Sequence, residues 1–439
     1  MKNTKGGFSY KSLSVVVINL GCDKNRVDAE KMLFKFTQMG LKISDSVKKA
    51  DLIIVNTCAF IKSAIDESEK TIKETLTVKK SGAKVLITGC YAERFYDKAK
   101  QDFPEVDGII RLQENQKLED YINTLFNQNI SIEKKPLARL LSTPKHYAFL
   151  KISDGCNNFC TYCTIPFIRG RYKSEPMEDL VNEAKALAQM GTKELIFIAQ
   201  DVTRYGQDLY GEPKLVELIQ KISAIDGIEC IRLHYCYPEM VDDKLINEVV
   251  TNDKVAKYFD IPLQHISDRI LKAMNRRGDS KTILNLLDKL HKNNITVRST
   301  FIVGFPTETE QDFNELIDFL KNQKMKYVGF FAYSREENTK AAQMEQVPDK
   351  IKKSRLKRVQ EVQYNILKNI QKEQKGKVIK AICDGFVQEN VYLLRGMDSS
   401  PEVDTNIYVY SESPLEAGKF YNVKIKKVIN DIDLEGVIV

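Results

Sequence analysis

The feature that most constrains the fold is a pattern that occurs three times near the N-terminus. A short, β-branched apolar run ends in a cysteine in Ser14–Cys22, Asp51–Cys58 and Lys84–Cys90. Such runs are typical of strands that are buried on both faces of a sheet, and stretches with helical spacing of apolar residues separate them. Alternating strands and helices predict parallel strands with crossover helices. We therefore expect an N-terminal open parallel α/β sheet domain over residues 1–140.

The three cysteines of this pattern, Cys22, Cys58 and Cys90, each follow a predicted strand. The carboxyl ends of parallel strands meet at one edge of a sheet, which is where ligands bind in open α/β folds. Three thiols from neighbouring strand ends therefore predict a shared three-thiolate cluster. The alternative is that each cysteine is a small buried apolar residue, as free cysteines often are. Their common place in three successive runs favours a site.

A second set of cysteines lies in one short loop, at the spacing C-x3-C-x2-C: Cys156, Cys160 and Cys163. A structural zinc site usually takes four ligands from two separated pairs. Three cysteines in one tight loop instead suit a cubane iron–sulfur cluster, in which three irons take protein ligands and the fourth stays open to a chelating small molecule. A zinc knuckle and three buried cysteines are the alternatives.

The middle of the chain also alternates between strands and helices. A polar stretch at about residues 112–143 comes before this middle part, and it predicts a helix followed by a linker. Six short apolar runs are strand candidates: Ala148–Ser153, Glu194–Asp201, Glu229–Leu233, Tyr258–Gln264, Thr296–Gly304 and Lys326–Phe331. They predict a partial TIM-like (βα)6 barrel over residues 141–371, with its site at the carboxyl ends of the strands.

The last part of the chain has a different pattern of apolar and polar residues. Residues 350–375 have the spacing of an amphipathic helix, and five short alternating runs follow from Gly376. They predict a small antiparallel β-barrel of the oligonucleotide-binding kind over residues 372–439. From Gly376 onward seven basic and ten acidic residues give a net charge of −3, in a chain whose total is +7. Because phosphate binding needs positive charge, this barrel suits a basic protein partner better than a nucleic acid.

The overall composition is that of a globular protein. No apolar run reaches the length of about 18 residues that a membrane span needs, so we expect no membrane partner. Residues 1–7 lack the apolar core of an export signal. Nine cysteines without such a signal favour metal ligation in a reducing cytoplasm over a disulfide framework.

The C-x3-C-x2-C loop resembles that of the radical S-adenosylmethionine (SAM) enzymes. The resemblance implies that the open iron binds SAM, and that one electron cleaves SAM to a 5′-deoxyadenosyl radical. Tyr162 resembles the family's aromatic residue beside the adenine, and Gly304 and Phe305 form a turn where backbone approaches it. Four polar side chains on or after predicted strands are further candidates for SAM contacts: Gln200, Gln264, Arg298 and Tyr333.

The order of these features along the chain resembles that of the methylthiotransferases: three cysteines at strand ends, then the C-x3-C-x2-C loop, then a small barrel. Members of that family carry two [4Fe–4S] clusters and a TRAM domain. Three stretches resemble the branch that modifies small-subunit ribosomal protein twelve (S12): Asn19–Asp28, Ile198–Gly206 and Pro262–Leu271.

The resemblance implies methylthiolation of the β-carbon of an aspartate in S12, either free or in the 30S subunit. One SAM serves as methyl donor and another as radical source. It also implies an electron donor such as flavodoxin or ferredoxin, a sulfur donor, and no catalytic side chain beyond the cluster ligands. Two alternatives stay open. One is methylthiolation of transfer RNA at N6-isopentenyladenosine or threonylcarbamoyladenosine, and the other is a non-catalytic iron–sulfur carrier.

Overall fold

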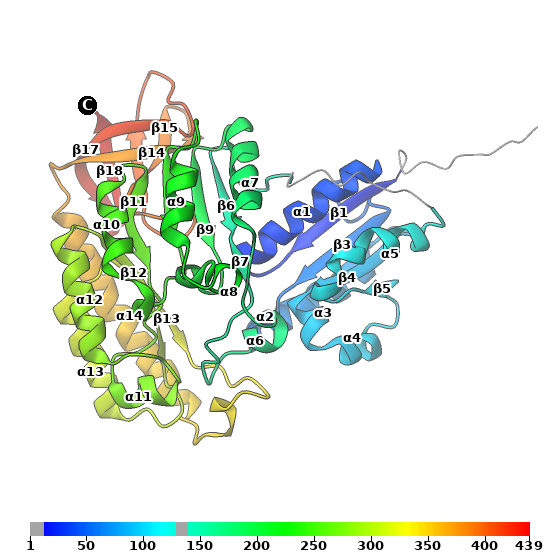
Figure 1. Cartoon of the computed structure of the whole chain (residues 1–439), viewed down its shortest axis with the longest axis horizontal. Coiled ribbons are helices and arrows are strands. Elements are labelled where there is room, and N and C mark those ends of the chain that lie inside the picture. Colours follow the sequence, from blue (N-terminus) through cyan, green and yellow to red (C-terminus); the bar gives the residue numbers. More distant parts are fainter. Residues whose placement is uncertain (1–12, 129–138) are drawn as a thin grey trace, which may run out of the picture. The chain divides into compact units, whose positions relative to one another are not determined.

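The computed structural model describes residues 13–128 and 139–439. The chain divides into two compact units (Figure 1). One comprises the chain up to Ser142 together with Cys163–Arg171, and the other comprises Thr143–Tyr162 and Tyr172–Val439. Residues 1–7 and part of the predicted linker lie outside the described residues. The predicted boundaries at residues 140 and 371 stay a prediction.

The first unit contains the expected parallel sheet, with its strands in the order β2-β1-β3-β4-β5. The bounds of its strands are β1 Ser14–Asn19, β2 Lys42–Ile43, β3 Leu52–Thr57, β4 Lys84–Gly89 and β5 Gly108–Ile109. The three central strands are the predicted ones, and the two short edge strands had no clear signal in the sequence. Asn19 pairs with Asn56, and Thr57 pairs with Gly89, so the central strands end at nearly the same level.

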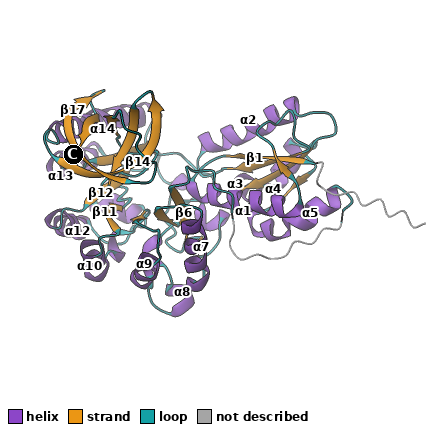
Figure 2. Cartoon of the chain, turned by 90° about the horizontal axis from the view of Figure 1, so that it is seen from above, coloured by secondary structure: helices purple, strands orange, loops and turns teal. Residues whose placement is uncertain are grey.

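Helices cover both faces of this sheet (Figure 2). Their bounds are α1 Asp23–Met39, α2 Lys62–Val78, α3 Cys90–Arg94, α4 Tyr96–Asp102, η2 Leu112–Lys117 and α5 Leu118–Leu125. Helices α1 and α5 pack on one face, where Phe36 and Ile122 meet Ile54. Helices α2, α3 and α4 pack on the other, where Ile72 and Tyr91 join the core. Short helix α6, Ile165–Ile168, adds Ile168 to this second core.

The second unit contains the six predicted parallel strands, in the order β13-β12-β11-β10-β9-β6. Their bounds are β6 Tyr147–Lys151, β9 Glu194–Ile198, β10 Cys230–Leu233, β11 Val255–Asp260, β12 Thr296–Val303 and β13 Tyr327–Ala332. The sheet is open, as expected for a partial barrel, and helices alternate with its strands (Figure 1). The longer helices are α7 Met177–Gln189, α9 Leu215–Ser223, α10 Asp243–Thr251, α12 Ser280–Lys292 and α13 Glu310–Gln323.

Shorter elements lie between the strands of this sheet. They are the antiparallel strand pair β7 Ser153–Asp154 and β8 Lys173–Ser174, helices α8 Gln207–Tyr210 and α11 Asp268–Ala273, and the 3-10 turns η3 Val202–Arg204 and η4 Pro238–Met240. A further 3-10 turn, η5 Ala341–Gln343, follows β13. Among the described residues, no helix is both long and apolar enough to cross a membrane.

Helix α14, Asp349–Lys372, precedes a closed five-stranded barrel in the order β14-β15-β16-β18-β17. The strands of this C-terminal barrel are β14 Val378–Gln388, β15 Val391–Gly396, β16 Ile407–Tyr410, β17 Phe420–Ile429 and β18 Asp433–Ile438. The predicted small antiparallel β-barrel is confirmed at four of its five strand pairs, and the fifth pair, β16 with β18, is parallel. After β16 the chain does not continue to the neighbouring position in the barrel, because β17 pairs with β14. Strand β18 then fills the position between β17 and β16.

The segment Met397–Thr405, between β15 and β16, binds the six-stranded sheet; we call it the anchoring segment. Its bonds to side chains of the sheet run from Arg232 to the Met397 carbonyl, from His234 to Ser400, from Tyr147 to Glu402, from Tyr258 to Asp404 and from Tyr327 to Ser399. Tyr147 and Tyr327 begin their strands. The anchoring segment therefore contacts the first residues of β6 and β13 and, through His234, the residue that follows β10.

Candidate metal centres

Cys22, Cys58 and Cys90 lie together at the carboxyl edge of the first unit's sheet. Cys58 and Cys90 directly follow β3 and β4, whose last residues are paired in register. Gly21 brings Cys22 into reach, because a Cβ on Gly21 would lie 2.8 Å from the Cys58 Cβ and 2.9 Å from its Sγ. The Gly21 φ of +90° is also one that glycine adopts without strain. The sequence pattern therefore does bring these three cysteines to one place.

Amide side chains hold the loops that carry these cysteines. Asn25, at the start of α1, donates 2.9 Å hydrogen bonds from its Nδ2 to the carbonyls of Leu20 and Thr57. Its Oδ1 lies 3.8 Å from the Cys90 Sγ. Asn56 donates to the Asn25 carbonyl at 2.9 Å, which ties β3 to the same helix. Sequence reasoning missed Asn25, since an Asn in a first helical turn is an ordinary residue there.

Arg169 places a positive charge beside the same cysteines. Its side chain is buried, with Nη2 lying 4.0 Å from the Cys90 Sγ and 3.3 Å from the Asp28 carboxylate. Burial raises the pKa of the Cys90 thiol to about 12, although the Arg169 guanidinium opposes that shift. Burial likewise raises the pKa of Cys58. Thiols in such a place lose their protons when a metal centre supplies compensating positive charge.

The donor set of this site fits an iron–sulfur cluster. It consists of three soft thiols, a ligand type that favours such clusters. Within the described ranges, no three His, Cys, Asp or Glu side chains are arranged to hold one metal ion. A [4Fe–4S] cluster binds each thiolate through a different iron, so it does not require that arrangement.

The division of the chain into two units falls within the C-x3-C-x2-C loop, between Tyr162 and Cys163. Cys156 and Cys160 are buried in the second unit, whereas Cys163 is half-buried and belongs to the first. Asn158 shapes the loop, because its backbone N–H lies 3.5 Å from the Cys156 Sγ. Burial raises the pKa of Cys156 to about 11, and the Asn158 N–H opposes that shift. Three cysteines on so short a stretch fit the cluster expected from their spacing.

Two further residues fix the conformation of this loop. Phe159 has a φ of +48°, which is uncommon for a residue other than glycine. Asn275 donates hydrogen bonds to the carbonyls of Asn158 and Phe159, at 3.1 and 3.0 Å, and so holds the turn. Asp201 follows β9 in the chain and is fully buried. Its carboxylate accepts a 3.1 Å hydrogen bond from the Asn158 side chain. Burial raises the pKa of Asp201, while Thr203 and Asn158 oppose the shift.

Four of the predicted SAM contacts come together: Tyr162, Gly304, Phe305 and Tyr333. The Tyr162 and Phe305 rings lie 6.3 Å apart between centroids, and the Phe305 and Tyr333 rings lie 5.5 Å apart, both edge to face. Gly304 lies beside them and has a φ of +69°. A Cβ there would clash with the Lys352 side chain, so packing against α14 explains this glycine.

Glu308 holds the Gly304–Phe305 turn. Its Oε2 accepts hydrogen bonds from the Gly304 and Phe305 backbone N–H groups, at 2.8 and 3.3 Å. Its Oε1 binds the Arg355 Nη1 at 2.8 Å. Both side chains are buried, so the turn is set by a fully enclosed ion pair. Sequence reasoning missed both residues, because Arg355 lies 47 positions further along the chain.

The two predicted glutamines lie after strands β9 and β11. Gln200 donates a 3.1 Å hydrogen bond to Asp154, while its Oε1 is buried and has no hydrogen-bond partner within the described chain. A buried acceptor of this kind suits a donor on a bound molecule. Gln264 has a φ of +72°, and its backbone pairs with Thr300 and Ile302 of β12. The aromatic group, in which Phe305 and Tyr333 are buried and Tyr162 is half-buried, and the Gln200 acceptor fit a nucleoside-bearing cofactor.

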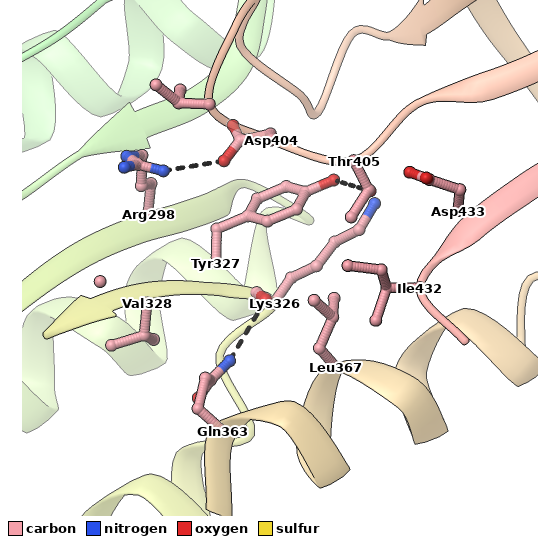
Figure 3. A pocket seen from close by; sticks show the side chains of 12 residues that line it. Arg298, Lys326, Tyr327, Val328, Gln363, Leu367, Asp404, Thr405, Ile432 and Asp433 are labelled. Atoms are coloured by element: carbon pink, nitrogen blue, oxygen red, sulfur yellow. Dashed lines mark hydrogen bonds and ion pairs between the residues drawn. The ribbon is translucent and has the colours of Figure 1, made fainter. Parts of the chain in front are cut away.

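Arg298 lies apart from these residues. It is the third residue of β12, and its Nη1 binds Asp404 of the anchoring segment at 2.9 Å. Figure 3 shows the Arg298–Asp404 pair in the wall of a cavity of about 270 Å³, together with Tyr327, Gln363 and Thr405. A contact between Arg298 and SAM stays a prediction. The ion pair with Asp404 is enough to explain an arginine at this position.

Three family models match the chain. The Radical SAM superfamily matches residues 150–320, the uncharacterized protein family UPF0004 matches residues 14–111, and a TRAM domain matches residues 376–439. Among solved structures, the radical SAM methyltransferase TsrM from Kitasatospora setae is similar in fold, with a TM-score of 0.57 and 14% identity. That similarity covers 76% of this chain and 77% of TsrM. The chain is thus a radical SAM protein with a C-terminal TRAM domain.

Curated relatives define the family more closely. The ribosomal protein uS12 methylthiotransferase RimO of Clostridium tetani is 42% identical, over 96% of this chain and 97% of that protein. RimO of Acetivibrio thermocellus is 42% identical over 97% and 98%, and RimO of Clostridium acetobutylicum is 43% identical over 96% and 97%. The chain belongs to the ribosomal protein uS12 methylthiotransferase family.

Proposed function

We propose that this protein methylthiolates the β-carbon of an aspartate residue in ribosomal protein S12, as a radical SAM enzyme. The observation that carries the proposal is the identity of 41–43% with uS12 methylthiotransferases along nearly the whole chain. The β-carbon of aspartate has an unactivated C–H bond that no side-chain base deprotonates at a useful rate. The chemistry therefore falls to cofactors, which the protein binds and orients.

In this proposal two [4Fe–4S] clusters are present. Cys156, Cys160 and Cys163 hold the one that binds SAM, and Cys22, Cys58 and Cys90 hold an auxiliary cluster for the inserted sulfur. The cofactors supply a carbon radical from one SAM and a methyl group from another.

The protein's own residues then position the cofactors and exclude water. Tyr162, Phe305 and Tyr333 would line the site of the adenine, and the Gln200 Oε1 would accept a hydrogen bond from SAM. The ring contacts and the unpartnered acceptor described above support these roles.

The acidic C-terminal barrel is the proposed docking site for S12, free or in the 30S subunit. Its net charge of −3 complements a basic protein. The proposal also includes a one-electron donor such as flavodoxin or ferredoxin, a sulfur donor, and a cytoplasmic location.

The test is anaerobic reconstitution with iron and sulfide, followed by incubation with SAM, dithionite and either S12 or transfer RNA. Mass spectrometry should find one methylthio group on an aspartate of S12 and none on transfer RNA. A Cys58→Ala variant should leave S12 without sulfur, and a Cys383→Ala variant, which changes a buried cysteine in the C-terminal barrel, should not. Modified transfer RNA beside unmodified S12 would overturn the substrate and keep the reaction. Absence of SAM cleavage would favour an iron–sulfur carrier.

A further inference from the structure

Arg276 is a buried cation that forms no ion pair with a carboxylate among the described residues, although Glu239 is close enough for its charge to act on it. It follows helix α11 and is only 9% exposed. Its Nη2 donates a 2.7 Å hydrogen bond to the Pro262 carbonyl, and its Nη1 lies 3.9 Å from the Cys160 Sγ. Within the described part of the chain, no Asp or Glu oxygen lies within ion-pair distance of this guanidinium.

Other buried arginines of the same unit differ from Arg276 in this respect. Arg395 binds Glu194 at 2.6 Å, and Arg355 binds Glu308 at 2.8 Å. A buried charge without a counter-charge is strongly unfavourable, so such pairing is the rule. The groups around Arg276 that can carry negative charge include Tyr237, Tyr162, Cys160 and Glu239. Among these, Cys160 is the expected cluster ligand, and its sulfur lies 3.9 Å from the Arg276 Nη1.

Tyr237 lies beside the same sulfur, and its hydroxyl can donate to that sulfur when Cys160 is a thiolate. Its hydroxyl lies 3.8 Å from the Cys160 Sγ. Its ring lies 4.2 Å from the Arg276 guanidinium carbon, so the two donors also contact each other. A 3.2 Å hydrogen bond from its backbone N–H to the Thr203 hydroxyl holds Tyr237 in place. The two donors come from loops after different strands, and their convergence on one cysteine is a tertiary arrangement.

We propose that Arg276 and Tyr237 raise the reduction potential of the cluster that Cys156, Cys160 and Cys163 hold. This proposal rests on the proposed function. A [4Fe–4S] cluster with thiolate ligands becomes more negative by one charge when it accepts one electron from an external low-potential donor. Positive charge and hydrogen bonds at a ligating sulfur favour the reduced state, and a buried site strengthens that effect. Arg276 and Tyr237 thereby make the electron transfer that precedes SAM cleavage easier.

The test compares four variants of the full-length protein, each reconstituted anaerobically with iron and sulfide. Arg276→Gln removes the charge, Arg276→Lys keeps the charge without the planar fork, and Tyr237→Phe removes only the hydroxyl. Arg277→Gln is the matched control, because it removes the same charge from the next residue, which is exposed. Iron and sulfide content establish assembly, and a dithionite titration followed by electron paramagnetic resonance gives the midpoint potential without SAM.

We expect a clearly lower potential for Arg276→Gln, a smaller decrease for Tyr237→Phe and Arg276→Lys, and the wild-type value for Arg277→Gln. Equal potentials in Arg276→Gln and Arg277→Gln would overturn the proposal. If Arg276→Gln assembles no cluster, the potential of Tyr237→Phe decides. Weaker SAM binding at an unchanged potential would overturn it as well, and would assign Arg276 to the SAM carboxylate. A wild-type protein without a cluster would instead contradict the proposed function itself.

Discussion

Arg395 of strand β15 and Glu194 of strand β9 form a fully buried ion pair, with Nη2 and Oε2 2.6 Å apart. Glu194 is the first residue of its strand, and its other oxygen accepts a 2.8 Å hydrogen bond from the Arg232 Nε. Arg395 also binds Asp384 of β14 through its Nε, at 2.9 Å. One buried network therefore joins the C-terminal barrel to the amino-terminal edge of the six-stranded sheet. Together with the anchoring segment, it makes this barrel a structural part of the second unit.

Replacing Arg395 with Met should strongly destabilise the protein. The change leaves Glu194 and Asp384 buried with less positive charge, and breaking a buried pair in this way costs about 3–5 kcal/mol. Denaturant unfolding followed by circular dichroism measures the loss. The matched control is Lys427→Met, which breaks an exposed pair with Glu435 in the same barrel and should change little. Equal effects of the two substitutions would contradict a structural role for the network.

Glu194 should make stability depend on pH in the acid range. Burial acts to raise its pKa, but Arg395 and Arg232 outweigh burial and lower the pKa from 4.5 to about 2. A depressed folded-state pKa stabilises the protein above pH 4.5, and this contribution is lost as the pH falls toward 2. Thermal unfolding of Glu194→Gln between about pH 6 and about pH 3 should therefore vary less with pH than the wild type does. Parallel curves for the two proteins would refute this assignment.

Arg355 should act as a positioning residue for the Gly304–Phe305 turn. An Arg355→Met variant leaves Glu308 without its cation, so the carboxylate no longer holds both backbone N–H groups in place. We expect about tenfold weaker SAM binding, equivalent to about 1.4 kcal/mol, with unchanged iron content. Hydrogen exchange should also be faster at the Gly304 and Phe305 amides. Arg358→Met, which changes a half-exposed arginine one turn away that binds Glu310, serves as control. Unchanged exchange at the turn would show that Arg355 does not position it.

Gly21→Ala should damage the auxiliary site selectively. The added methyl group meets Cys58 and the φ of +90° becomes strained, so the thiol set at this edge is displaced. We expect the purified variant to keep about half of the wild-type iron, held by the C-x3-C-x2-C loop. Gly82→Ala provides the control, because its φ of +77° gives the same kind of strain but nothing lies within 4 Å of the new Cβ. Full iron content in Gly21→Ala would contradict this account of the glycine.

Local patterns were enough to predict the sheets and the gathering of the first three cysteines. The β-branched runs before Cys22, Cys58 and Cys90 define strands by themselves, and parallel strands bring their carboxyl ends together. Arg298 had no comparable signal, since its partner Asp404 lies 106 positions away. Its contact with SAM stays a prediction, whereas the ion pair that the structure shows for it was not predictable from the local sequence.

The parallel β16–β18 pair was missed for a related reason. Strand alternation alone does not reveal that the chain crosses the barrel between β16 and β17. Arg276 was missed too, because its tertiary position beside Cys160, 116 positions away, singles it out, while its local sequence does not. Contacts between segments that are distant in the chain depend on tertiary packing. The local pattern of residues in a single sequence does not indicate them.

The central claim is that two sets of three cysteines hold two clusters, and counting iron and acid-labile sulfide per chain tests it most directly. Anaerobically reconstituted wild-type protein should contain about eight of each, and the Cys22→Ala/Cys58→Ala/Cys90→Ala variant about four. A wild-type protein with only about four irons, or one that binds zinc in their place, would contradict the claim.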